Sequence, residues 1–248
     1  MHFISENRID GDVIEREFTL GEIPGFLWTP ATASSSAPAP LILLGSPGGL
    51  GLRKMYPRLV ARARHAASDG FASVAIELPG TGERPRDADA EQAHADFRQA
   101  LAAGEPVSDA IIERLILPLV EQAVPEWQST MDAVLALPEI DGPVGFSGGV
   151  ISIGIRLAVV DPRIAAAVLF AGSFVPRVMF EEARQVTIPL HVLLQWDDEG
   201  NDRQAALDLF DAFVSKEKTL NANMGGHTGV PQSAGDAAAG FLTRHLKR

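Results

Sequence analysis

The chain has 248 residues, of which 46% are hydrophobic and 21% are charged, and its formal net charge is −11. A chain of this size can bury one substantial core, which is ordinary for a single α/β domain with a small insertion. It contains no cysteine, which excludes disulfides, a thiolate nucleophile and cysteine-ligated metal centres. The acidic balance disfavours nucleic acids and anionic membrane surfaces as partners.

The sequence contains no run of about 18 apolar residues, so it predicts no transmembrane helix. Its first eight residues lack the apolar centre of a secretory signal. We therefore expect a cytoplasmic protein with no membrane partner.

The N-terminal part has the pattern of an antiparallel hairpin. Residues 13–20 alternate imperfectly and predict a first strand, and residues 23–28 follow a Gly21-Glu22 turn as its partner. Residues 29–40 are mostly small residues and prolines, which is typical of a surface loop.

From residue 41 onward, apolar strands alternate with helices. Short, continuously apolar runs are typical of strands buried on both faces of a parallel sheet. The alternation predicts an α/β fold with a mostly parallel central sheet and helices on both faces. The expected strands are 41–44, 72–78, 143–146, 164–170, 190–196 and 216–222, and the expected helices are 56–68, 125–137, 150–160, 203–213 and 232–246.

Residues 84–124 are longer than a simple connection needs. An alanine-rich, charged stretch at 87–103 predicts an exposed helix, and an apolar helical stretch at 107–124 is interrupted by Pro118. We interpret 84–124 as a helical cap, or lid, inserted into one domain that spans residues 1–248.

Residues 145–149 read GFSGG, a G-x-S-x-G match between a strand-like and a helix-like segment. In that context Ser147 is expected at the tip of a sharp strand-to-helix turn, in a strained conformation with its hydroxyl exposed. The Gly148 N–H would then lie at a helix N-terminus, where it can donate to an oxyanion. The same pentapeptide also fits an ordinary turn with an ordinary serine.

Other polar residues follow the predicted strands. Asp197 and Asp198 come after one strand, and His227 lies in a glycine-rich loop before the last helix. Because the carboxyl ends of parallel strands share one edge, these groups are expected on the same rim as Ser147. A serine nucleophile needs a base, and that base needs an orienting carboxylate. Both aspartates are candidates, and Asp198 is favoured.

The order serine, aspartate, histidine and the G-x-S-x-G match resemble the α/β-hydrolase superfamily, within its esterases and dienelactone-hydrolase-like serine hydrolases. The resemblance runs from Leu41 to the C-terminus. It implies that Ser147 is the nucleophile, Asp198 the acid and His227 the base.

The resemblance also implies an oxyanion hole. Gly148 supplies one N–H, and the second should come from the loop after Leu44, where family members often have His-Gly. This chain has Ser46-Pro47 instead. Proline has no N–H to donate, so Gly48 is the candidate, with Gly49 behind it. Dienelactone-hydrolase relatives place a functional carboxylate near the position of Glu77. In this chain Glu77 is expected to order the loop that follows it.

The expected activity is hydrolysis of a small carboxylic ester through an acyl-enzyme, with no metal and no cofactor. The same triad on this fold also serves thioesters, amides, C–C bonds and acyl transfer, and the fold also occurs in binding proteins without turnover. The sequence leaves the substrate and the oligomeric state open.

Overall fold

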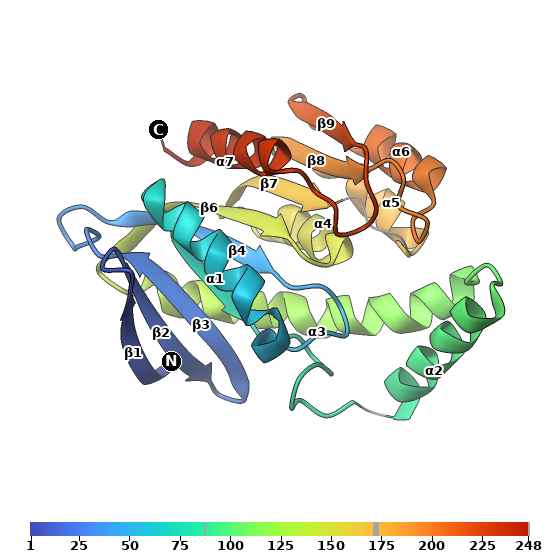
Figure 1. The fold of residues 1–248 in the computed structure, drawn as a ribbon, viewed down its shortest axis with the longest axis horizontal. Coiled ribbons are helices and arrows are strands. Elements are labelled where there is room, and N and C mark those ends of the chain that lie inside the picture. The colour runs from blue at the N-terminus through green and yellow to red at the C-terminus, as the bar shows by residue number, and fades with distance from the viewer. Residues whose placement is uncertain (87, 171–173, 248) are drawn as a thin grey trace.

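Nine strands form one mixed sheet in the computed structural model, which describes residues 1–86, 88–170 and 174–247 (Figure 1). The strand order is β1-β2-β3-β5-β4-β6-β7-β8-β9. The strands are β1 (His2–Ile9), β2 (Val13–Leu20), β3 (Ile23–Pro30), β4 (Ala39–Gly45), β5 (Ala72–Ile76), β6 (Ile140–Gly148), β7 (Ile164–Phe170), β8 (Leu190–Gln195) and β9 (Lys218–Asn223).

The six strands from β5 to β9 in that order pair in parallel, and β1, β2 and β3 pair antiparallel at one end of the sheet. The mostly parallel α/β sheet is therefore confirmed. The expected N-terminal hairpin is β2 and β3, but a third strand, β1, precedes it. That strand is largely exposed and carries no clear apolar alternation, so no hydrophobic pattern predicts it.

Helices cover both faces of the sheet. On one face α1 (Leu52–Ser68) and α7 (Gln232–Leu246) pack on an apolar layer that includes Ile42, Leu44 and Val168. The opposite face is covered by α3 (Asp109–Leu135), α4 (Ile151–Val160), α5 (Val178–Ala183) and α6 (Arg203–Ala212). Alternate residues of a strand face opposite layers, so each core strand contributes to both.

The helical insertion is built differently from the prediction. The expected helices at 107–124 and 125–137 are one continuous helix, α3, with Pro118 and Pro125 inside it. A proline inside a helix costs about 3 kcal/mol. The C-terminal half of α3 offsets this cost, because Trp127, Met131 and Val134 are buried in the core.

The N-terminal half of α3 pairs with α2 (Ala88–Ala103), and Figure 1 shows these two segments projecting beyond the sheet. An ion pair between Arg114 and Asp96 joins them. The first residue of the predicted 87–103 helix lies outside the described residues. No helix in the described parts of the chain is long and apolar enough to span a membrane.

Gly154 permits the close approach between α4 and the sheet. A methyl group added there would lie 2.6 Å from a ring carbon of Phe146 and 2.8 Å from Leu169 Cδ2. The helix that follows the serine strand therefore packs against that strand at van der Waals distance, which fixes where the connecting turn lies.

We expect Gly154→Ala to lower the free energy of unfolding by about 1–3 kcal/mol, because overpacking forces these neighbours apart. Gly240→Ala is the matched control, since Gly240 lies in α7 with no atom near its added methyl group. Alanine there should raise the free energy of unfolding by about 0.5–1 kcal/mol. Urea denaturation of both variants measures the difference, and equal shifts would show that α4 does not need glycine.

Candidate active site

Ser147 lies within β6, one residue before the strand ends. Its register partners are Leu44 on β4 and Val168 on β7, and the residue is partly exposed. Its hydroxyl accepts a hydrogen bond of 3.2 Å from Arg62, which belongs to α1. Ser147 therefore faces the layer of α1 and α7.

The expectation of a strained serine at the tip of the turn is wrong. Among the described non-glycine residues, only Asp10 and Phe174 have positive φ. The left-handed turn is made instead by Gly148 (φ 72°) and Gly149 (φ 76°). Glycine adopts this conformation without the steric penalty that serine would carry, so the sharp turn falls one residue later than the sequence match suggested.

The glycines of the motif are needed for close contacts, although not with α4. A methyl group at Gly145 would lie 2.7 Å from Leu246 of α7. One at Gly149 would lie 2.7 Å from the Cα of Gly45 and 2.9 Å from the backbone nitrogen of Ser46. The turn after β6 is therefore pressed against the chain as it leaves β4.

Asp198 and His227 are in direct contact. The Nδ1 atom of His227 lies 2.7 Å from Oδ2 of Asp198, and Oδ1 of Asp198 accepts the backbone N–H of Gly200 at 3.1 Å. The Asp198 side chain is only 3% exposed, whereas that of His227 is 59% exposed. A buried carboxylate thus holds one nitrogen of the imidazole and leaves the other toward solvent.

The structure does not join Ser147 to His227 by a hydrogen bond. The His227 ring contacts the Phe170 ring edge-on, with centroids 5.4 Å apart. Val168 on β7 is the register partner of Ser147, and Phe170 follows it by two residues. Strand geometry therefore puts the Cα atoms of Ser147 and Phe170 roughly 8 Å apart. The base therefore lies closer to the rim of the sheet than the serine does.

The neighbouring acidic residues have separate surroundings. Asp197 is exposed and Asp198 is buried, and of the two it is Asp198 that contacts His227. Asp202 caps α6 by accepting the N–H groups of Gln204 and Ala205. These aspartates line a cavity of about 630 Å³ together with Trp196 and Arg203.

The loop after β4 passes beside the turn after β6. An added methyl group at Gly48 would lie 3.5 Å from Val150 and 3.9 Å from Leu119 of α3. The next residue, Gly49, has φ 78° and lies near His94 of α2. Both glycines are exposed, and within the described residues neither N–H donates to a backbone carbonyl. The insertion thus reaches the segment that was predicted to hold the second oxyanion donor.

Glu77 has a structural role at the start of α1. Its carboxylate accepts the backbone N–H of Leu52 at 3.0 and 3.2 Å and the hydroxyl of Thr81 at 2.6 Å. It thereby caps the positive N-terminal end of α1, which begins at Leu52, four residues before the predicted start. The expectation that Glu77 orders the neighbouring loops agrees with these contacts.

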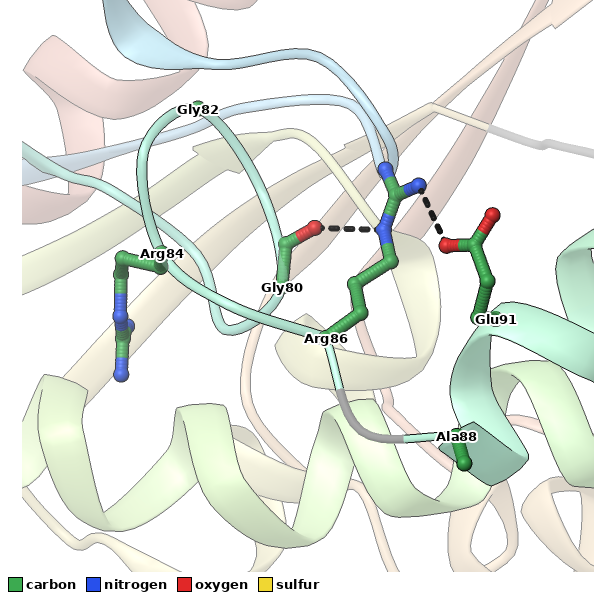
Figure 2. A pocket seen from close by; sticks show the side chains of 6 residues that line it. All are labelled: Gly80, Gly82, Arg84, Arg86, Ala88 and Glu91. Atoms are coloured by element: carbon green, nitrogen blue, oxygen red, sulfur yellow. Dashed lines mark hydrogen bonds and ion pairs between the residues drawn. The ribbon is translucent and has the colours of Figure 1, made fainter.

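A second cavity, of about 490 Å³, lies between the loop after β5 and the start of α2. Figure 2 shows the Arg86 guanidinium between the carbonyl of Gly80 and the carboxylate of Glu91, with Arg84 turned away. Arg84 instead makes two hydrogen bonds to Glu126 of α3. Burial lowers the pKa of His94 and the positive charge of Arg86 adds to the effect.

The insertion also contacts the segment that follows β7. The rings of Phe97 and Phe174 meet edge-on at 4.9 Å, and Arg177 pairs with Asp109 at 3.4 Å. Phe174 has φ 67°, which is strained for a residue with a side chain. Residues 171–173 lie outside the described residues.

Sequence reasoning missed Arg62, although a signal was present. The buried positions of α1 are Leu52, Met55, Leu59, Ala63 and Ala66. Position 62 follows Leu59 by three residues and precedes Ala66 by four, so it lies on the same stripe. A charged residue on an apolar stripe indicates a specific partner inside the molecule.

Comparisons with known proteins give the fold. No family model matches the chain, and no curated protein matches it. Among solved structures, a PEG-bound cold-adapted esterase from an Arctic intertidal metagenomic library is 28% identical, with a TM-score of 0.76 over 99% of this chain and 100% of that one.

Two more distant structures share the fold. An acetyl xylan esterase from Paenibacillus sp. R4 is 14% identical, with a TM-score of 0.65 over 99% of this chain and 88% of its own. The structure of a putative dienelactone hydrolase from Klebsiella pneumoniae is 16% identical, with a TM-score of 0.66 over 93% of this chain and 97% of its own.

The chain therefore has the α/β-hydrolase fold. Over its full length the chain is structurally similar to a cold-adapted esterase.

We expect Glu77→Gln to lower the free energy of unfolding by about 1–3 kcal/mol, because the buried donors that face the carboxylate lose charge-assisted hydrogen bonds. Glu83→Gln removes the same charge from an exposed position in the same loop and should leave the stability nearly unchanged. Thermal and urea unfolding of the two variants tests this, and equal stabilities would show that Glu77 is not needed at the start of α1.

Proposed function

We propose that this protein is a serine hydrolase that cleaves a small carboxylic ester through Ser147, His227 and Asp198. The observation that carries the proposal is the 2.7 Å hydrogen bond between His227 and the buried Asp198, at the carboxyl edge of an esterase-like sheet. A buried carboxylate on Nδ1 sets the tautomer in which Nε2 can take a proton. Such a pair is the base half of a triad.

In the proposed reaction the Ser147 oxygen attacks the ester carbonyl while His227 takes its proton. The carbonyl electron pair moves to oxygen and forms an oxyanion. When this intermediate collapses, the ester C–O bond breaks and the leaving alcohol takes the proton from His227. Water then hydrolyses the acyl-enzyme by the same steps. This chemistry uses neither a metal ion nor a cofactor.

The proposal requires His227 and Ser147 to come together when substrate binds. Catalytic hydrogen bonds are often long or misaligned without substrate. The loop that carries His227 has glycines at positions 225, 226 and 229, and Gly225 has φ 133°. Glycine-rich backbone rearranges at low steric cost, and the loop is exposed, so movement of His227 is the less costly way to close the gap.

The oxyanion is assigned to the N–H groups of Gly148 and Gly48, with Gly49 as the alternative second donor. Gly148 follows the nucleophile, and Gly48 lies beside Val150 on the loop after β4. Pro47 has no N–H to donate. Gly48 is the next residue, and it is exposed, so its N–H is assigned to the ligand.

The substrate is proposed to be ester-like, because the similar structures are esterases. The same triad would also act on a thioester, an amide or a C–C bond, or transfer the acyl group to an alcohol. We assign the pocket wall to the cap at 84–124 within one domain of residues 1–248, where His94, Phe97 and Leu119 approach the strand ends.

Replacing Ser147 with alanine should abolish turnover of a p-nitrophenyl ester, with kcat reduced on the order of 10⁶-fold, as for the loss of a triad serine. Labelling by a fluorophosphonate probe should disappear in the same variant. Ser152→Ala is the control, since Ser152 is the next serine along the chain and lies in α4. Labelling that persists in Ser147→Ala and is lost in Ser152→Ala would assign the nucleophile elsewhere.

Asp198→Asn should reduce kcat by about 10⁴-fold, because the amide favours the wrong histidine tautomer. Asp197→Asn makes the same substitution at the adjacent, exposed residue. This variant should keep nearly full turnover. Steady-state kinetics of the pair decides which aspartate is the acid. A larger loss in Asp197→Asn would reverse the assignment.

A second candidate function is ligand binding without turnover. The observation that favours it is the Ser147 hydroxyl, which contacts Arg62 and is not hydrogen-bonded to His227. Saturable binding of esters by a wild-type protein that neither hydrolyses them nor reacts with the probe would support this candidate.

A further inference from the structure

Arg62 reaches the two strand ends at the centre of the candidate site. Its Nη1 donates to the carbonyl of Gly45 at 3.1 Å, and its Nη2 donates to the carbonyl of Ser147 at 2.5 Å and to its Oγ at 3.2 Å. A methyl group added at Gly148 would lie 3.1 Å from Nη2. The guanidinium therefore contacts β4, β6 and the first residue of the turn.

The charge of Arg62 has no counter-charge within the described residues. Two other arginines of α1 are paired, Arg53 with Glu17 and Arg64 with Asp10, but no ion pair joins Arg62 to a carboxylate of the described residues, and its contacts are the carbonyls of Gly45 and Ser147 and the Ser147 hydroxyl. Burial lowers the pKa of Arg62 to about 10, so the guanidinium keeps its charge in neutral solution. Arg62 is half-buried, and partly burying a cation that has no carboxylate partner costs free energy.

Binding two carbonyl groups does not require that charge. A neutral amide side chain also donates to carbonyl oxygens, and buried backbone acceptors need a donor only. The third contact is different, because Ser147 Oγ is the atom on which negative charge develops when its proton leaves. Arginine has no acceptor and only donates, so the Ser147 O–H is left free to point at a base.

We infer that Arg62 is a further catalytic residue, which donates to Ser147 Oγ and stabilises the negative charge that develops there as the proton passes to His227. This inference rests on the proposed function. Arg62 keeps its own proton throughout. The electron pair of the O–H bond stays on Oγ and forms the new bond to the carbonyl carbon, and the proton goes to His227 Nε2.

Arg62→Gln and Arg62→Lys separate the charge from the hydrogen bonds. Glutamine keeps donors without charge, and lysine keeps the charge with a different donor geometry. We expect Arg62→Gln to reduce kcat about 10²-fold, the typical effect of removing one donor to developing charge, with little change in KM. Arg62→Lys should recover about tenfold of that loss. The rate of fluorophosphonate labelling of Ser147 should fall and recover in parallel.

Arg64→Gln is the matched control, because it removes the same charge from the same helix at an exposed ion pair, and it should have wild-type turnover. The unfolding midpoint of each variant is measured first, and kinetics are recorded well below it. If Arg62 only binds the strand carbonyls, both Arg62 variants lose stability. Their kcat and labelling rate then do not depend on whether the new side chain is charged.

The outcomes are distinguishable from failure of the proposed function. Wild-type turnover in folded Arg62→Gln, or equal kcat in Arg62→Gln and Arg62→Lys, overturns the role of Arg62 and leaves the hydrolase intact. A wild-type protein that hydrolyses no ester and takes no label overturns both. If Arg62→Gln does not fold, labelling within about tenfold of wild type in folded Arg62→Lys supports the role of the charge, and labelling slowed about 10²-fold there overturns it.

Discussion

The contact between the ends of β4 and β6 is the constraint on which the site depends. Gly45 and Gly148 are register partners, and Gly149 lies against Gly45 and Ser46 so closely that no side chain fits. Two parallel strands normally leave their last carbonyl groups for water or a following helix. Here a single side chain, Arg62, binds one carbonyl from each strand. The position of Ser147 relative to the loop after β4 is therefore fixed by backbone packing and by α1 together.

The electrostatic arrangement around the site has two unequal halves. On the rim, the carboxylate of Asp198 is buried and contacts Nδ1 of His227. The imidazole is a hydrogen-bond donor to this carboxylate and becomes its positive partner when it is protonated. Beneath the turn, the positive charge of Arg62 faces carbonyl dipoles and one hydroxyl. A low-dielectric surrounding strengthens such interactions. A proton that leaves Ser147 for His227 would place negative charge beside Arg62 and positive charge beside Asp198, so both halves would favour the transfer.

Much of the fold was predictable because its strands are buried on both faces. Helix α7 and strand β7 follow the predicted bounds, since apolar periodicity is strong there and Gly or Pro residues mark the ends. The failures have physical causes. Strand β1 is exposed and has no apolar pattern, and the prolines of α3 suggested a break that burial of Trp127 and its neighbours overrides.

The candidate site was predictable in part for a similar reason. Parallel topology predicted Asp197, Asp198 and His227 on one edge of the sheet, and the structure shows that Asp198 is the aspartate in contact with His227. The conformation of Ser147 did not follow, because GFSGG contains two glycines after the serine and either can take the left-handed turn. The partner of its hydroxyl comes from a helix 85 residues away in sequence, so only the three-dimensional packing of α1 reveals it.

The proposed triad requires the gap between Ser147 and His227 to close, and the packing of the two segments favours movement of the histidine. β6 is central in the sheet, hydrogen-bonded to β4 and β7, with Gly145 against α7 and Gly149 against β4. Displacing it would break two ladders and a close-packed layer, and such interiors deform little. The loop of His227 is exposed, and the carbonyl of Gly226 accepts hydrogen bonds from the side chain of Gln195 and from the backbone N–H of Gly229. Asp198 follows β8 by three residues and also accepts the Gly200 N–H, so the carboxylate that contacts His227 is held at the edge of the sheet. The proposed triad therefore requires His227 to move toward Ser147, which β6 holds in place.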